Sequence, residues 1–561
     1  MDSDSDYEEE FEITEDKIQS MLKFCANGSS SSIKKLLKLY HNAIKCRCSK
    51  KDENRNKFFI EESVYLDLIA KSQEYASILF NQTGPVVDEG QDYKIKITAK
   101  TFVLDTIQLV SSNKSFMDSI KLSLITLSKP NILRWIVAIG HVELHFLKIV
   151  FKILSNYPNQ GIRLSSFSLL KCYLDMIMLP EYNLTQYGHA LHNGLKKYNP
   201  NDLSTTKINN FSIGIYKSYL RSLSKGLNPK NWTLSRLSRN CVVELLVMIH
   251  SDKLYIVAFR QLRKIGKDTI DAWKKSKLDS ICNWAFVESL TIWATVIGRT
   301  TPKLDHLVYP LVTISTASLK LGQNNERFAP FILCISKELN HLSRDIDKFI
   351  PIASHLLTLL DKLSKSKEYS KVKMPTIGIK NNENNNNNKL LGESHSAYED
   401  TDAEHEYISD EDCGIHVDNH AADKRKPMPE LAIFKLSLSQ NNKDYNDIMY
   451  HVEDLSRIII TQHISLLAHH PSFPEIILPI VKHLKKHKNS KPWIRKLLGL
   501  IDESADRIRS LRKEIKFDKV NLDKLIFFKT SKIPIITHSF REMELLEKGI
   551  ASVLVANSNK Q

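Results

Sequence analysis

Two histidines, His141 and His145, stand four residues apart, a spacing that lets two imidazole rings on one helix face share a metal ion. The acid between them, Glu143, does not occupy the position of a metalloprotease base, and no third ligand follows nearby. Histidines that simply pack on a helix are much more common than metal ligands. We therefore expect no metal at this pair.

A second possible metal set is formed by Cys25, His41, Cys46 and Cys48. The C-x-C spacing suits zinc poorly, and the segment has the pattern of a helix, so we expect free thiols. The chain has eight cysteines without the spacing of a disulfide framework, which is typical of a reducing compartment.

Motifs for nucleotide binding or covalent catalysis are missing from the sequence. Gly266-Lys267 resembles the end of a phosphate-binding loop, but Gln261 stands where the first glycine belongs. No G-x-G-x-x-G, G-x-S-x-G or H-E-x-x-H occurs. The sequence therefore predicts a protein that is not an enzyme, with no cofactor and no small-molecule substrate.

Aromatic residues could stack on RNA bases, and Trp284, Phe286 and Trp293 are the best candidates for such a role. Their helical spacing favours packing in a core, and we expect that instead.

Charge is the strongest indication of a partner. Residues 1–16 and 393–412 each contain nine Asp/Glu and no Lys/Arg, so the rest of the chain carries a formal net charge of +33, against +15 overall. A field this positive favours a polyanionic partner such as RNA over mere solubility, although lysine-rich helix faces also occur without one.

The elements that position these residues are predicted to be helices throughout. Glycine is scarce, at 17 of 561, and apolar residues recur at i, i+3, i+4 and i+7, as in Ile132, Trp135, Ile136 and Ile139. Short alternating pieces, near Tyr93–Ile97 and Ile433–Leu438, are the only strand candidates. Helix after helix with short breaks predicts an all-α, degenerate HEAT/armadillo-like α-solenoid.

The chain is predicted to have five parts. Low-complexity and charged segments interrupt the helical pattern, and they cannot bury enough apolar surface to fold alone. The parts are a disordered acidic tail (1–20), a solenoid (21–364), a disordered Asn-rich and acidic insertion (365–428), C-terminal repeats with a basic face (429–530) and an uncertain tail (531–561). The acidic start is not a signal peptide, and no run of eighteen apolar residues occurs, so we expect no membrane contact.

The last helices are the most basic, with twelve Lys/Arg against four Asp/Glu over residues 482–516. Such a density of cations predicts salt-sensitive contacts with phosphates. The candidate RNA-binding residues are Lys482, Lys485, Lys486, Arg495, Lys496, Arg507 and Arg512.

Several blocks between about Tyr216 and Phe517 resemble the nucleolar complex protein 2 family, in the same order. They include the segment from Tyr255 to Arg263, the tryptophan-rich Asn283–Trp293, Leu307–Val312, Phe349–Ala353 and Phe473–Ile476. We interpret these blocks as residues that pack helices together. The chain departs from the family at Pro330-Phe331-Ile332-Leu333, where relatives have Pro-Leu-Arg-Phe.

The resemblance implies a protein of the nucleus, nucleolus and nucleoplasm that binds and does not catalyse. It implies a heterodimer with a second helical-repeat protein, nucleolar complex protein 1 or 3, on pre-ribosomal RNA particles of the large subunit. A karyopherin-like or armadillo transport adaptor is the alternative, because it too is a binding solenoid.

Overall fold

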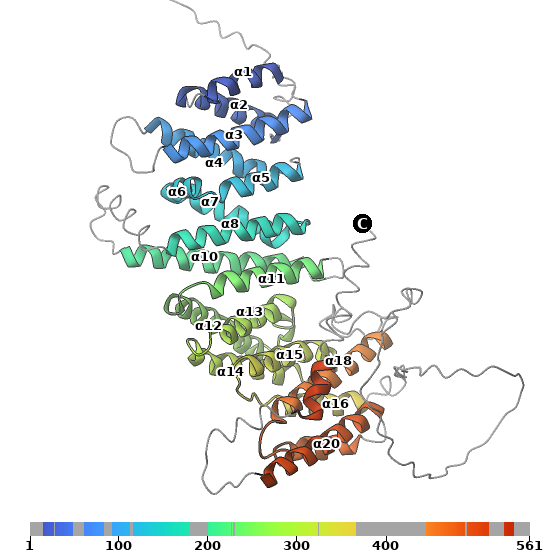
Figure 1. Ribbon diagram of the computed structural model, residues 1–561. Helices are drawn as coiled ribbons and strands as arrows, with labels where there is room; N and C mark the ends of the chain where they lie inside the picture. Colours follow the sequence, from blue (N-terminus) through green and yellow to red (C-terminus); the bar gives the residue numbers. More distant parts are fainter. Residues whose placement is uncertain are drawn as a thin grey trace, which may run out of the picture.

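In this computed structural model, all regular structure in the part of the chain that is described is helical (Figure 1). The described residues are 15–26, 29–48, 61–82, 93–112, 116–178, 200–225, 227, 231–323, 325–365, 445–487, 491–514 and 532–542. The helices of the first half are α1 (Glu15–Ala26), α2 (Ser30–Cys48), α3 (Glu62–Gln82), α4 (Tyr93–Ser111), α5 (Met117–Leu127), α6 (Pro130–Ala138), α7 (Gly140–Asn156) and α8 (Gln160–Met178).

The second half continues in the same manner. Its helices are α10 (Pro200–Ser222), α11 (Trp232–Val247), α12 (Ser251–Lys274), α13 (Trp284–Thr300), α14 (Val308–Gly322), α15 (Ala329–Asp345), α16 (Ala353–Lys365), α18 (Tyr445–Leu467), α19 (Leu478–Lys486) and α20 (Pro492–Glu514). Short 3-10 turns lie between several of them: η2 (Leu223–Lys225), η3 (Leu278–Ser280), η4 (Asp305–Leu307), η5 (Glu326–Phe328) and η8 (Glu475–Ile477).

The helices stack in successive layers along one axis. Each packs against near neighbours in the chain: α2 against α3 and α4, α7 against α8 and α10, and α13 against α11 and α15. Figure 1 shows this succession from α1 at one end to α20 at the other. Layers that contact only their neighbours are the arrangement of an α-solenoid, so the predicted all-α class is confirmed.

Local sequence explains the most buried layer. Asn283 precedes α13 and its side chain accepts a hydrogen bond from the backbone N–H of Phe286 at 2.9 Å, which caps the helix. The helix then buries apolar residues on almost every side, because α11, α14 and α15 cover it. Among the described helices, none is at once long and apolar enough to cross a membrane.

The C-terminal helices rejoin the stack through α18, which packs against α15. The amide nitrogen of Asn340 donates to the carbonyl of Ile459 at 3.0 Å, and the Asn340 oxygen lies 3.2 Å from Nδ1 of His463. These buried bonds join α18 to α15, and α20 packs against α18 and α19 at the end of the solenoid. The insertion predicted for 365–428 lies outside the described residues beyond Lys365.

Three segments of the structure differ from the sequence-based expectation. Residues 15–20 belong to α1, not to the tail, because Ile18 buries its side chain. Tyr93–Ile97 is the start of α4 and not a strand, whereas Ile433–Leu438 lies outside the described residues. Residues 534–542 form a helix that packs on α18 by burying Ile533 and Ile535, so part of the predicted tail is folded.

Two helix glycines provide a matched test of packing. An added Cβ at Gly214 would lie 2.7 Å from Cε2 of Phe151, a buried ring held edge-on against Phe211. An added Cβ at Gly499 would meet nothing within 4 Å. We expect Gly214→Ala to lower the free energy of unfolding by about 1–3 kcal/mol through overpacking. Gly499→Ala should raise it by about 0.5–1 kcal/mol.

Thermal unfolding of the full chain checks both substitutions. The prediction requires midpoint shifts of opposite sign. A stabilising Gly214→Ala would show that the Phe151 ring can move aside.

Candidate nucleic-acid interface

Three of the predicted RNA-binding cations lie on the outer face of α19. Ile480, Val481 and Leu484 are the buried residues of this helix, which packs against α16 and α20. The opposite face exposes Lys482, Lys485 and Lys486, and the helix contains no acid. The amphipathic pattern of nine residues thus leaves an apolar face inside and three lysines outside, where Leu478 is the one large apolar residue of α19 that is exposed.

Arg495 and Lys496 extend this surface. Both are exposed in the first turns of α20, which follows α19 after a connection of a few residues and packs on it. Neither forms an ion pair with any residue that the structure describes. We call Lys482, Lys485, Lys486, Arg495 and Lys496 the basic platform.

The later part of α20 is electrostatically mixed. Arg507 is exposed, but Asp502, Glu503 and Asp506 are exposed as well, within one or two turns of it. Arg509 is paired with Asp506 at 2.7 Å. The acids lower the positive potential here, so Arg507 is a weaker candidate than the basic platform.

Arg512 is held in a structural contact. Its guanidinium lies 2.7 Å from Oε2 of Glu475 and also donates to the carbonyl of Phe473. Hydrogen bonding by Arg512 lowers the pKa of Glu475 to about 2. Arg512 thus bonds the end of α20 to the turn before α19. Because its guanidinium is engaged in these contacts, Arg512 is not a candidate for the RNA interface.

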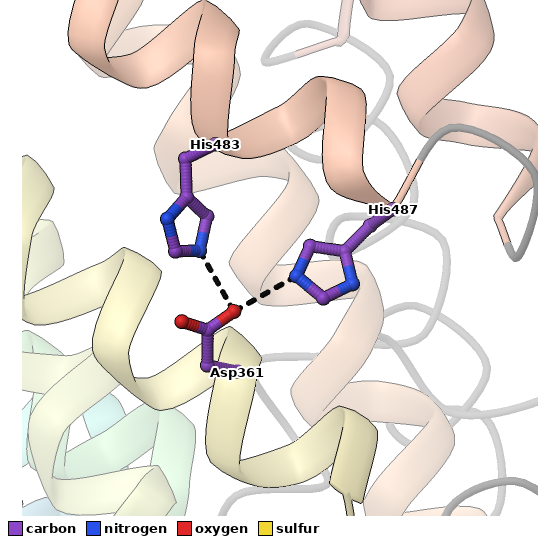
Figure 2. Close-up of side chains that lie close together, drawn as sticks. All are labelled: Asp361, His483 and His487. Atoms are coloured by element: carbon purple, nitrogen blue, oxygen red, sulfur yellow. Dashed lines mark hydrogen bonds and ion pairs between the residues drawn. The ribbon is translucent and has the colours of Figure 1, made fainter.

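A cluster that the sequence did not predict lies beside the basic platform. Figure 2 shows His483 and His487, one turn apart, both directed at the same carboxylate oxygen of Asp361 on α16. Each Nε2 is 2.8 Å from Oδ1, and all three side chains are partly buried. The His483–His487 spacing is visible in the sequence, but Asp361 is 122 residues from His483.

This cluster could hold a metal in principle, since its ligand atoms lie within 4.8 Å of one another. A tetrahedral zinc would hold them about 3.3 Å apart and use a fourth ligand in a structural site. Distances of 2.8 Å fit N–H···O hydrogen bonds better, and the neighbouring Lys362, Lys482 and Lys486 disfavour a cation. We interpret the cluster as a clamp between α16 and α19.

The clamp predicts a pH dependence of stability. Burial alone would raise the pKa of Asp361, but hydrogen bonds and positive charge from His487 and His483 outweigh it and hold the pKa below its usual value. A carboxyl with a lowered folded pKa contributes stability above about pH 4, and this contribution is lost as the pH falls through the folded pKa. Asp361→Asn should therefore cost under about 1 kcal/mol at pH 7, and progressively less as the pH falls below about 4.

Thermal midpoints of both proteins between pH 3 and pH 7 provide the measurement. A difference that does not change with pH would contradict the clamp. A zinc-dependent rise of the midpoint in the wild type alone would instead identify a metal site.

The other candidate ligands form no cluster among the described side chains, and the side chain of Cys48 lies outside these. His141 and His145 are both exposed on α7, and Nδ1 of His41 contacts Asp105 at 2.8 Å. Burial raises the pKa of the Cys25 and Cys46 thiols, which disfavours the thiolate that zinc needs.

The aromatic residues of α13 are part of the core, as predicted. Trp293 is fully buried, with its ring centroid 5.5 Å from that of Tyr216, while Trp284 contacts Trp232 and Phe286 contacts Phe331. None of the three is available to stack on a base. The interface candidates are therefore cationic and not aromatic.

Comparison with known proteins identifies relatives of this chain. A family model described as the Noc2p family matches residues 207–394, from α10 through α16. The nucleolar complex protein 2 of Drosophila melanogaster is 25% identical over 177 residues, which cover 31% of this chain and 23% of that protein. The predicted family resemblance is confirmed. A second relative, an uncharacterized NOC2 family protein of Schizosaccharomyces pombe, is 22% identical over 376 residues, 62% of this chain and 48% of its own.

The match thus spans less than half the length of either curated relative of the Noc2 family. Within the matched region, our interpretation of the blocks as packing residues is only partly right. Trp293, Leu311 and Ile352 are buried, but Tyr255 and Tyr309 are exposed. Tyr255 on α12 and Tyr309 on α14 therefore do not act as packing residues within the described structure.

Proposed function

We propose that the chain is a non-catalytic nucleolar assembly factor that binds RNA-containing precursors of the large ribosomal subunit. The Noc2 family match carries this proposal, since the family name suggests a nucleolar factor of ribosome biogenesis. A stack of helices with a cationic end supports it, because phosphate contacts need positive charge and no catalytic group.

In the proposed mechanism, the solenoid is a degenerate HEAT/armadillo-type array that holds two kinds of partner. The basic platform contacts phosphates of precursor RNA without reading sequence. An apolar surface elsewhere on the stack contacts a second helical-repeat protein, nucleolar complex protein 1 or 3. The acidic segments 1–16 and 393–412 carry the opposite charge and compete with RNA or bind basic ribosomal proteins.

Affinity purification of the tagged full chain, followed by RNA sequencing and protein mass spectrometry, tests the function. We expect precursors of large-subunit ribosomal RNA, large-subunit proteins and one helical-repeat partner. Recovery of transport cargo and nuclear-pore proteins without precursor RNA would favour a karyopherin-like adaptor and overturn the proposal. Recovery of small-subunit precursors alone would also contradict it.

A further inference from the structure

Helix α12 has a second apolar stripe that nothing in the described structure covers. Its buried face packs Leu254, Val257 and Leu262 into the stack. Beside that face it exposes Tyr255, Phe259, Ile270 and Trp273, of which the Trp273 side chain is 65% exposed. At about 100° per residue, these four side chains fall within a sector of about 60°.

A groove lies between α14 and the middle of this stripe, where Phe259 and Ile270 line it. Figure 1 shows α12 and α14 next to each other, and the two helices are in contact. They approach closely because residue 266 is glycine, where an added Cβ would lie 3.4 Å from Ile314. The resulting groove has a volume of about 870 Å³, with apolar walls formed by Phe259, Leu262, Ile270, Pro310 and Ile314.

The rim of the groove is strongly basic. Arg260, Arg263, Lys264, Lys267 and Lys274 border it, against Asp271 as the one acid among its lining residues. All five cations are exposed. An apolar floor with a cationic rim is complementary to a segment that has an apolar face and acidic flanks.

We propose that this groove and the stripe beside it bind an amphipathic α-helix of a partner protein, with apolar anchors toward Phe259 in the groove and Trp273 on the stripe, and acidic residues toward the rim. From Tyr255 to Trp273 the stripe is about 27 Å long, the length of a helix of about 18 residues. The proposal deepens the proposed function, on which it rests, by assigning a surface and a chemical class to the protein partner.

A helix fits the groove better than RNA does. Leu262, Ile270, Pro310 and Ile314 are aliphatic or ring-saturated and offer no face on which a base can stack. The rings of Tyr255 and Phe259 stack on each other, 9° from parallel with centroids 6.1 Å apart. The groove therefore matches apolar side chains and not a row of bases.

The test replaces Ile270 by the photo-crosslinking amino acid p-benzoylphenylalanine in the full chain, with the crosslinked peptide identified by mass spectrometry. We expect a peptide of another protein with helical apolar spacing and acidic flanks. The same peptide, synthesised and labelled, should bind the purified full chain. Its affinity should fall at least thirtyfold in the variant Phe259→Ala/Trp273→Ala, since central aromatic residues dominate such interfaces.

The control variant Ile125→Ala/Leu144→Ala removes two equally exposed apolar residues on α5 and α7 and should leave binding unchanged. A crosslink to RNA, to a second copy of the chain or to its own acidic segment 393–412 would overturn the proposal, as would no crosslink. Because the crosslink reports the groove itself, its failure is distinguishable from loss of precursor RNA, which would contradict the proposed function instead.

Discussion

Reversing the charge of four lysines on the basic platform is expected to lower RNA affinity at least a hundredfold near 0.1 M salt. Each lost phosphate contact removes about 0.7–0.9 from the slope of log affinity against log salt, so four contacts remove about 3. Since these side chains are exposed and form no ion pair with described residues, the fold should remain intact. The substitutions are Lys482→Glu, Lys485→Glu, Lys486→Glu and Lys496→Glu.

Fluorescence anisotropy with a labelled transcript of large-subunit precursor RNA measures both quantities. The matched control reverses four exposed lysines on α4, α7 and α8, which changes net charge equally: Lys100, Lys148, Lys152 and Lys171. We expect that variant to stay within about threefold of the wild type, because steering by net charge is weaker than direct contact. Equal losses in both variants would show that the site is not localised.

The helices were predictable from sequence because their signal is local. The apolar spacing of Ile132, Trp135 and Ile136 predicted a helix, and these three residues are buried on one face of α6. The strand prediction for Tyr93–Ile97 was wrong because it considered too short a segment. Tyr93, Ile95 and Ile97 alternate over five residues, but Phe102, Val103 and Ile107 continue the segment as a helix and bury against the stack.

The site was less predictable because its contacts connect distant parts of the chain. The sequence identified the cations of α19 and α20, but not that Glu475 holds Arg512 or that acids surround Arg507. The Asp361 clamp joins helices on either side of the long insertion. The sequence likewise placed Tyr255 and Phe259 in a block of expected packing residues, and only the packing of the stack shows that both stay exposed.

Removing the amine of Lys491 is expected to destabilise the C-terminal helices by about 3–5 kcal/mol. Glu453 on α18 is fully buried; Lys491 Nζ donates to its Oε2 and Trp493 Nε1 to its Oε1, both at 2.9 Å. Lys491→Met leaves the carboxylate with one donor and an uncompensated buried charge. Hydrogen exchange of the α18–α20 amides measures the effect directly.

The double variant Lys491→Met/Glu453→Gln is the control, because it removes both charges and should cost less than about 1.5 kcal/mol. The bonds of Lys491 and Trp493 to Glu453 also fix the position of the basic platform. Arg495 and Lys496 come shortly after these two residues in the sequence. We therefore expect Lys491→Met to weaken RNA binding and the double variant to restore it, although both lack the same lysine. Equal RNA affinity in all three proteins would mean that the first turn of α20 need not be fixed for binding, and the cations would then act through a mobile segment.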